Sequence, residues 1–301
     1  MIKSVIVTNH LGKSLEIVLD NPELSGLAIT SITGLGEADA TINGTELAGS
    51  DYNAYNSSRL NKRNIVIDLK YWGDDIEASR LKSYQYFSTK NNIILRFITD
   101  HRDCECYGYV EKNTPNIFDP KSKAQISIIC LDPFFYGPNR ILEDFAYVTP
   151  LFHFPFSDSR SGEIQFGELN KRQEKNIYYS GETEIGFTFK VHMLGNVTGL
   201  ELTNVGTSEQ VKINDTKLQT IAGQGFKMGD DLIINSEEGH KSAILLRNGL
   251  ETNIINALDR RTKRPDWFKL YPGDNLFNYT ATSGATNVQI SIEYRILYKG
   301  V

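Results

Sequence analysis

The segment LYPGDNLFNYTATSGATNVQISIEYRILYKGV, residues 270–301, decides the fold class of this chain. Its Pro272-Gly273-Asp274-Asn275 stretch predicts a turn, because proline presets φ while glycine and asparagine tolerate the left-handed conformation. From Val288 onward apolar and polar residues alternate, with a break only at Leu297, and this is the period of a strand with one buried face. The pattern therefore predicts that the chain ends in a packed β-strand and that its terminus belongs to a core.

Strand patterns also dominate the rest of the chain. The turn at Leu11-Gly12-Lys13 joins residues 4–7 to residues 14–19 in an opening hairpin, and Asn248-Gly249 is a strong tight-hairpin signal. Further strands are predicted at residues 64–71, 93–98, 104–110, 124–131, 185–193, 197–202, 210–214, 231–234 and 241–247. The short strands beyond residue 184, with turns about every ten residues, are typical of a β-sandwich.

One helix is predicted, over residues 75–89. Asp74 and Glu77 have the spacing of a capping box, and Leu81, Tyr84 and Phe87 follow at helical intervals.

Residues 34–63, GLGEADATINGTELAGSDYNAYNSSRLNKR, form the least anchored stretch of the chain. They are rich in Gly, Ser, Asn and Asp and hold few apolar side chains. A loop of this length is uncommon inside a compact domain unless it is functional or gains order from a partner. We therefore expect a long polar loop that contacts a partner.

A domain boundary is predicted at CLDPFFYGP, residues 130–138. Two prolines and a glycine within this short segment stop regular structure, as linkers between domains do. The sequence thus predicts one domain over residues 1–138 and a second over residues 139–301. A length of 301 residues is sufficient for two separate cores.

Charge and composition argue against several classes of function. The formal net charge is −5, with acidic and basic residues spread through the chain, which argues against DNA binding as the main role. No apolar run is long enough for a signal peptide or a membrane span, so we expect the protein to be made and kept in a cytosol until release. The odd count of three cysteines argues against a disulfide framework.

The strongest candidate metal site combines His101, Cys104, Cys106 and Cys130. The C-x-C spacing lacks the usual knuckle geometry of structural zinc sites, and free cysteines are often buried in strands. We therefore expect core cysteines and no metal.

Other candidate sites also have simpler structural explanations. Gly34-x-Gly36 and Gly223-x-Gly225 lack the following helix that an anion site needs, and are interpreted as turns. The pairs Asp74-Asp75, Asp230-Asp231 and Glu237-Glu238 are interpreted as solvated charges at caps or turns rather than acid/base couples. Trp267, Phe268 and Tyr271 could form a sugar platform, but sandwich core is favoured. We expect no catalytic centre and no cofactor, since the five histidines are scattered and lie in no catalytic motif.

Four segments in order resemble the distal tail protein (Dit) family of long-tailed bacteriophages. They are the early hairpin with Gly12, the block from Asn64 to Phe87, the segment YGYV…ISIICLDPFFYG (residues 107–137), and the C-terminal domain. Within that domain, GDDLIINSEEGHKSAILLRNG (residues 229–249), PGDNLFNYT and a final YKGV follow one another.

The resemblance implies a mainly β fold, with a tail-tube-like N-terminal domain that carries one helix and a galectin-like C-terminal β-sandwich. It implies a non-enzymatic part of the virion tail tip or baseplate that forms a homo-hexamer. One ring face would meet the tail tube protein and the other the tail-associated hub or fibre protein, while receptor-binding proteins or a cell-surface glycan would attach outside. The short stretch from Phe154 to Glu184 implies a member without a large arm insertion in this C-terminal domain.

Two alternatives remain from the sequence. The chain could be the equivalent ring component of a phage-tail-like bacteriocin or injection particle, or a free glycan-binding β-sandwich protein.

Overall fold

A computed structural model describes residues 1–46, 48–49, 51–118, 123–150, 167–171, 173–261 and 267–301. Residues 151–166, which include the segment LFHFPFSD (residues 151–158) and the beginning of the stretch from Phe154 to Glu184, lie outside the described residues.

The chain divides into two compact units, of which the first contains residues 1–138 and 297–301 and the second residues 139–296. The sequence-based prediction assigned residues 139–301 to one domain, whereas residues 297–301 belong to the first unit. The last strand, β24 (Leu297–Tyr298), pairs with β10 (Phe135–Tyr136) of the first unit. The break in alternation at Leu297 therefore marks the point where the chain leaves the second unit.

The first unit is built on one antiparallel sheet with strand order β2-β1-β7-β8-β9-β6-β3. Along β6, Ile65, Ile67 and Leu69 are fully buried and their neighbours are more exposed, so one sheet face carries the core. Each such side chain contributes about 1.5–3 kcal/mol by leaving water. The strands are β1 (Ile2–Thr8), β2 (Ser14–Val18), β3 (Leu27–Thr33), β6 (Arg63–Tyr71), β7 (Asn92–Thr99), β8 (Asp103–Pro115) and β9 (Lys123–Cys130).

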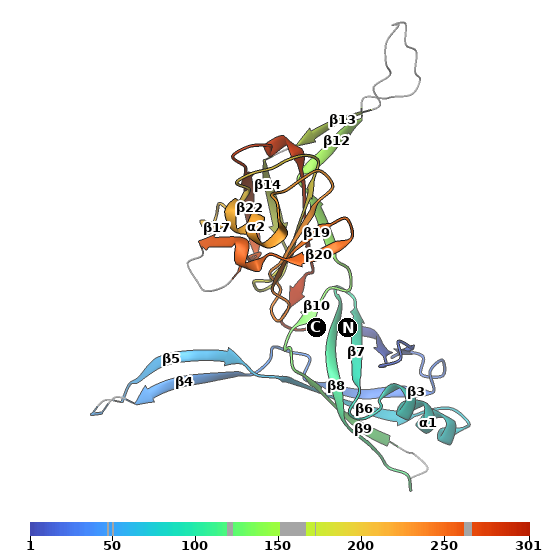
Figure 1. Cartoon of the computed structure of the whole chain (residues 1–301). Helices are drawn as coiled ribbons and strands as arrows, with labels where there is room; N and C mark the ends of the chain where they lie inside the picture. Colours follow the sequence, from blue (N-terminus) through green and yellow to red (C-terminus); the bar gives the residue numbers. More distant parts are fainter. Residues whose placement is uncertain (47, 50, 119–122, 151–166, 172, 262–266) are drawn as a thin grey trace, which may run out of the picture. The chain divides into compact units, whose positions relative to one another are not determined.

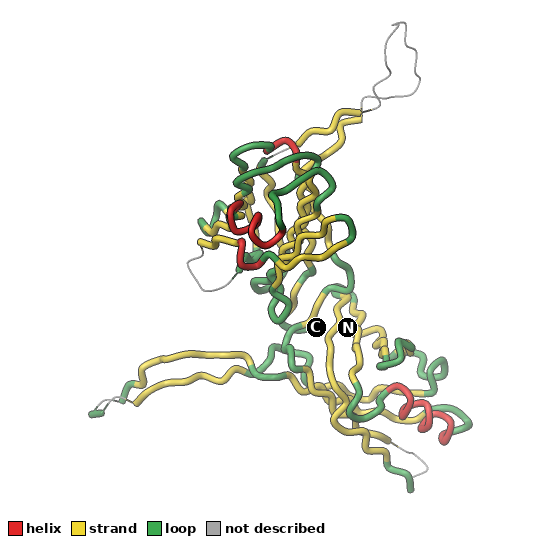
Figure 2. Tube along the Cα trace, in the orientation of Figure 1, coloured by secondary structure: helices red, strands yellow, loops and turns green. Residues whose placement is uncertain are grey.

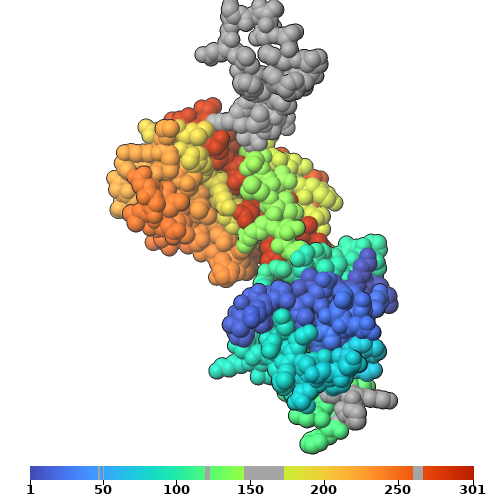
Figure 3. Space-filling view, turned by 90° about the vertical axis from the view of Figure 1, so that its right-hand side faces the viewer, coloured from blue at the N-terminus to red at the C-terminus, as the bar shows by residue number. Residues whose placement is uncertain are grey.

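The opening hairpin expected in this unit is present, and the strands predicted at residues 93–98 and 104–110 form a second one. β1 pairs with β2, and β7 pairs with β8, in antiparallel register. The N-terminal strand also pairs with β7, so the blue and teal surfaces of Figure 3 lie directly against each other.

Helix α1 (Ile76–Tyr86) differs from the prediction in its cap and in its packed face. The side chain of Asp75, not Asp74, accepts the capping hydrogen bond from Ala78 N. The buried positions of the helix are Ser79 and Ser83, whereas Leu81 is 50% exposed. The helix thus buries Ser79 and Ser83 in its middle, while Ile76 and Tyr86 at its two ends pack against the core.

Residues 34–63 do not form the expected loop. Most of them form an arm, defined here as the antiparallel hairpin of β4 (Ala40–Glu46) and β5 (Asn53–Leu60). Figures 1 and 2 show the arm extending away from the main sheet of the first unit as two strands without a covering helix.

The second unit is a β-sandwich, as expected. One sheet has the order β11-β23-β15-β18-β19-β20 and the other β14-β22-β16-β17-β21. Aromatic rings fill the space between them: Phe189 and Phe277 lie with ring centroids 6.4 Å apart, and Tyr179 and Tyr294 are 5.8 Å apart. Such pairs add about 0.5–1.5 kcal/mol each beyond their buried area.

The strands of the sandwich are β11 (Ile141–Asp144), β14 (Glu174–Tyr179), β15 (Thr188–Met193), β16 (Glu201–Asn204), β17 (Glu209–Ile213), β18 (Asp231–Asn235), β19 (Ser242–Arg247), β20 (Leu250–Asn253), β21 (Leu258–Arg261), β22 (Gly273–Thr280) and β23 (Val288–Tyr294). A separate hairpin joins β12 (Ala146–Pro150) to β13 (Gly167–Lys171), and two 3₁₀ turns span Ile255–Ala257 and Ala285–Asn287.

Helix α2 (Asp215–Ala222) was not predicted. Asn214 caps its start by accepting from Lys217 N, and Gly223 ends it with φ +76°. The tight turn at Asn248-Gly249 is confirmed, since both residues have positive φ between β19 and β20. Within the described part of the chain, no helix is both long and apolar enough to cross a bilayer.

The last five residues should stabilise the first unit and not the second. Deleting residues 297–301 from the full chain removes Lys299 O, one of four carbonyl acceptors of Arg63, and Gly300 O, an acceptor of Arg102. We expect a loss of about 3 kcal/mol in unfolding free energy, since hydrogen bonds to charged groups contribute about 1.5–3 kcal/mol each. Calorimetry measures the change in unfolding free energy, and amide hydrogen exchange at residues 34–36 shows whether the loss is local to the contacts of Arg63.

The matched control compares the isolated fragments 139–296 and 139–301. Both should fold with the same midpoint, because the five residues have no role without the first unit. A sandwich fragment that is unfolded without residues 297–301 would contradict the assignment.

Candidate functional site

The arm is the most exposed regular structure in the described residues of the first unit. Every residue of β4 and β5 is exposed. The side-chain contacts between the two strands are polar, and one of them is the hydrogen bond from Asn43 Nδ2 to Ser57 Oγ at 3.1 Å. Ile42 and Tyr55 nevertheless present 71% and 67% of their surface to solvent. A lone two-stranded hairpin is only marginally stable in water. The arm therefore has the properties of a segment that is completed by contact with another surface.

The base of the arm, where its two strands join the main sheet, is held by the buried guanidinium of Arg63. Arg63 begins β6 directly after the arm and is 4% exposed. Its Nε donates to Pro133 O at 2.8 Å, Nη1 donates to Gly34 O at 2.6 Å and also to Gly36 O, and Nη2 donates to Lys299 O at 2.8 Å. One side chain thus connects three segments: the residues that precede the arm, the segment around Pro133 and the C-terminal residues.

Backbone carbonyls, not carboxylates, accept the hydrogen bonds of this charged group. No acidic side chain in the described ranges forms an ion pair with Arg63, and its guanidinium lies 4.4 Å from the centroid of the Phe135 ring. Burial lowers the pKa of Arg63, but a guanidinium remains protonated in proteins. A buried charge is tolerated only when it is fully hydrogen-bonded. The carbonyls must therefore stay in place, which fixes the segments that carry them.

Gly34 is required where it stands. It has φ +83°, and a Cβ there would lie 2.1 Å from Asn64 O. Gly34-x-Gly36, interpreted from the sequence as a turn, has bends at both glycines, and both of their carbonyls accept hydrogen bonds from Arg63.

The candidate metal ligands do not form one cluster. Cys104, Cys106 and Cys130 are buried and form no disulfide with another described residue, whereas His101 is exposed. Cys106 Sγ lies 3.9 Å from Cys130 Sγ. Contact with Cys130 and burial raise the pKa of the Cys106 thiol, and metals bind thiolates. Across the described ranges no group of three or more His, Cys, Asp or Glu side chains could hold a metal.

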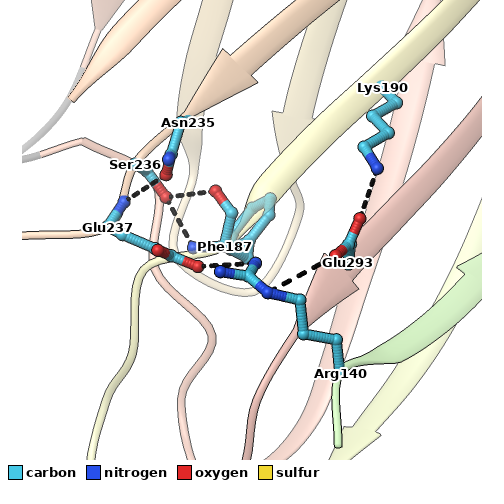
Figure 4. Close-up of polar contacts among 7 residues, drawn as sticks. All are labelled: Arg140, Phe187, Lys190, Asn235, Ser236, Glu237 and Glu293. Atoms are coloured by element: carbon cyan, nitrogen blue, oxygen red, sulfur yellow. Dashed lines mark hydrogen bonds and ion pairs between the residues drawn. The ribbon is translucent and has the colours of Figure 1, made fainter. Parts of the chain in front are cut away.

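The carboxylate pairs have mixed outcomes. Asp75 is the helix cap. Asp230 is not a solvated charge: it is buried, and Arg247 binds both its oxygens, Nε at 2.8 Å and Nη2 at 2.5 Å. Burial acts to raise the pKa of Asp230, but the hydrogen bonds from Arg247 and Lys227 N outweigh it and lower the pKa. Glu237 pairs with Arg140 at 3.1 Å (Figure 4).

The aromatic candidates are core, as favoured. Trp267 and Phe268 are buried, and Phe268 stacks with Phe187 at 6.4 Å. Tyr271 is half-buried. Gly223-x-Gly225 follows α2 as its C-terminal cap, so it is a turn.

The comparison with solved structures identifies the fold. This chain is similar to the crystal structure of the SPP1 Dit protein, described as a paradigm of the hub adsorption apparatus in phages that infect Gram-positive bacteria. The TM-score is 0.62 at 16% identity, covering 97% of this chain and 99% of that chain. The expected Dit-like fold is confirmed.

Two structures of the phage P2 baseplate in its activated conformation, with Ca and with Sr, also match over 97% of this chain and 98% and 97% of theirs. Their TM-scores are 0.48 and 0.47, at 12% and 11% identity. No protein-family model and no curated protein sequence matches this chain.

Replacing Arg63 by lysine should destabilise the first unit. A lysine ammonium keeps the charge but lacks the forked donors needed to reach carbonyls in separate segments. We expect about 3 kcal/mol lower unfolding free energy, with faster amide exchange at residues 34–36. Arg59→Lys on the exposed strand β5 is the control, and it should change stability by less than about 0.5 kcal/mol. Equal effects of the two variants would show that the carbonyl contacts of Arg63 are unimportant.

The protein should contain no bound zinc. Elemental analysis after purification without added metal should find less than stoichiometric zinc, because the described residues bring no three His, Cys, Asp or Glu side chains together around one point. Treatment with a chelator should leave the melting temperature unchanged. A drop in melting temperature that added zinc reverses would overturn this prediction.

Proposed function

We propose that this chain is a structural, non-enzymatic component of a phage tail tip or baseplate, where it forms a homo-hexameric ring. The observation that carries the proposal is the fold match to the SPP1 Dit protein over 97% of this chain and 99% of that one. Near-complete coverage of both chains supports the same two-domain organisation.

The arm supports a ring in particular. A closed ring needs a heterologous contact, in which one surface of a copy meets a different surface of the next. An exposed hairpin anchored at its root by a buried arginine supplies one half of such a contact. Ile42 and Tyr55 would provide its apolar anchors and the polar strands its hydrogen bonds.

In this role, one face of the ring meets the tail tube protein and the other the tail-associated hub or fibre protein. Receptor-binding proteins attach to the second unit, and DNA passes through the ring without specific binding. The net charge of −5 supports free passage, because phosphate binding needs clustered lysine and arginine. The protein is made in the bacterial host cytoplasm and resides at the distal tip of the virion. The equivalent ring of a phage-tail-like bacteriocin is the alternative.

Arm removal tests the ring. Asn61 N lies 2.8 Å from Asp39 O, so residues 40–60 can be replaced by an Asn-Gly turn with little disturbance at the root. We expect the wild type to show a six-membered ring by light scattering and electron microscopy at high protein concentration. The shortened chain should stay monomeric and fully folded.

A matched pair of variants isolates the apolar anchors. Ile42→Ala with Tyr55→Ala should weaken assembly at least tenfold, whereas Leu250→Ala, at a similarly exposed position in the second unit, should not. Monomers at every protein and salt concentration, together with no ring in a particle that contains the protein, would refute the proposal.

A further inference from the structure

Two cysteines of the first unit lie close enough to react with each other. Cys106 stands on β8 and Cys130 ends β9, and both side chains are fully buried. Their Sγ atoms are 3.9 Å apart, with no bond between them. Cys104, two residues before Cys106 on the same strand, is equally buried. It provides an internal comparison for the reactivity of the pair.

Gly108 makes room for the approach of the two sulfur atoms. Tyr109, the residue after it, pairs with Ile129 across the two strands, so Gly108 faces the position of Cys130. A Cβ at residue 108 would lie 3.0 Å from Cys130 Sγ. The Cys130 sulfur thus occupies space that a side chain would need, on the face of β8 that also carries Cys106, because residues two apart in a strand share a face.

The backbone around the pair allows the sulfur atoms to come together. A disulfide bond is about 2.05 Å long, so the two atoms must approach by about 2 Å. The pairing of β8 with β9 ends at Tyr109 and Ile129, short of both cysteines. Around Cys106, β8 pairs instead with β7 and β10. Among the described strand pairs, none joins Cys106 to Cys130, so side-chain rotation with a small shift of the strand ends can close the bond.

The two thiols have different chemical roles. Contact with Cys106 and the charge of the Arg63 guanidinium lower the pKa of Cys130, although burial acts to raise it. Contact with Cys130 and burial raise the pKa of Cys106. Arg63 stands directly opposite Cys130 in the register of β6 and β9. Because the thiolate is the nucleophile in sulfur chemistry, Cys130 reacts first with an oxidant and Cys106 then attacks the oxidised sulfur.

We propose that Cys106 and Cys130 form a reversible disulfide bond when the protein meets a peroxide outside a reducing cytosol. A peroxide suits this site because both sulfurs are fully buried, and a molecule of nearly the size of water reaches them through small local openings. A peptide-sized disulfide needs a much larger opening. The modification goes beyond the ring-forming role and requires no ring.

The reaction balances with hydrogen peroxide as the oxidant. The Cys130 thiolate attacks one peroxide oxygen, the O–O bond breaks, and the departing hydroxide takes up the thiol proton to become water. Cys106 Sγ then attacks Sγ of the Cys130 sulfenic acid, the S–O bond breaks, and the hydroxide leaves with the Cys106 proton as a second water. The two thiols are oxidised to one disulfide and the peroxide is reduced to water. The bond ties β8 to β9 beside Arg63, at the base of the arm.

The test uses the full wild-type chain, purified with a reductant, freed of it, and treated with hydrogen peroxide in the native state. Alkylation in urea should then find two of the three cysteines protected, and a reductant should release both. Digestion with trypsin and a glutamate-specific protease separates Cys104 from Cys106 at Glu105, so mass spectrometry identifies the linked pair. We expect a single link, between Cys106 and Cys130.

Three variants assign the roles of the cysteines. Cys104→Ala is the matched control, since it removes an equally buried thiol, and it should form the same link as the wild type. Cys106→Ala should form no link and should accumulate a Cys130 sulfenic acid that dimedone traps, whereas Cys130→Ala should give neither product.

The wild-type result does not depend on whether a variant folds. Absence of the Cys106–Cys130 link after peroxide treatment of the native wild type would overturn the proposal. A link that includes Cys104, or a Cys106–Cys130 link that forms only in urea, would overturn it as well.

Discussion

The buried charge of Arg63 is the constraint on which the first unit depends. A guanidinium that is 4% exposed and has no carboxylate partner in the described ranges must be satisfied by backbone carbonyls. Those carbonyls belong to residues 34–36, Pro133 and Lys299, which are far apart in the sequence. The same contact therefore sets where the arm starts, where β10 begins and where the C-terminus ends. Apolar packing alone would fix none of these positions so closely, because it is not directional.

This arrangement separates the stability of the unit from the exposure of its arm. The arm adds little burial of its own, since every residue of β4 and β5 is exposed. Its direction is set at the root, where Arg63 and Gly34 leave the backbone little freedom. A segment that is marginal alone but fixed at its base loses less conformational entropy when it meets a partner than a free loop would. We infer that this is why a polar hairpin is suited to an assembly contact.

The sequence predicted the strands whose alternation of apolar and polar residues reflects one buried face. It failed for the elements whose structure is held by polar contacts. The strands around Ile65 and Val288 alternate strictly, and they are where the pattern predicted them. The arm was taken for a loop, because its strands have no buried face and hence no apolar alternation. Arg63 gave no signal either, since a single arginine in a polar stretch resembles any solvated charge. Helix α2 could have been found from its Asn214 cap and Gly223 stop.

The same reasoning explains why the arm, as a candidate binding surface, is mainly polar. The strands of the arm carry no core residues, so substitutions there should alter binding with little effect on stability. Core positions behave in the opposite way: Phe277, fully buried between the sheets, tolerates no loss of volume. Asp230 belongs with the core despite its charge, because Arg247 satisfies both of its oxygens. Exposure and partner count, rather than residue type, therefore separate exposed carboxylates such as Asp144 from structural ones such as Asp230.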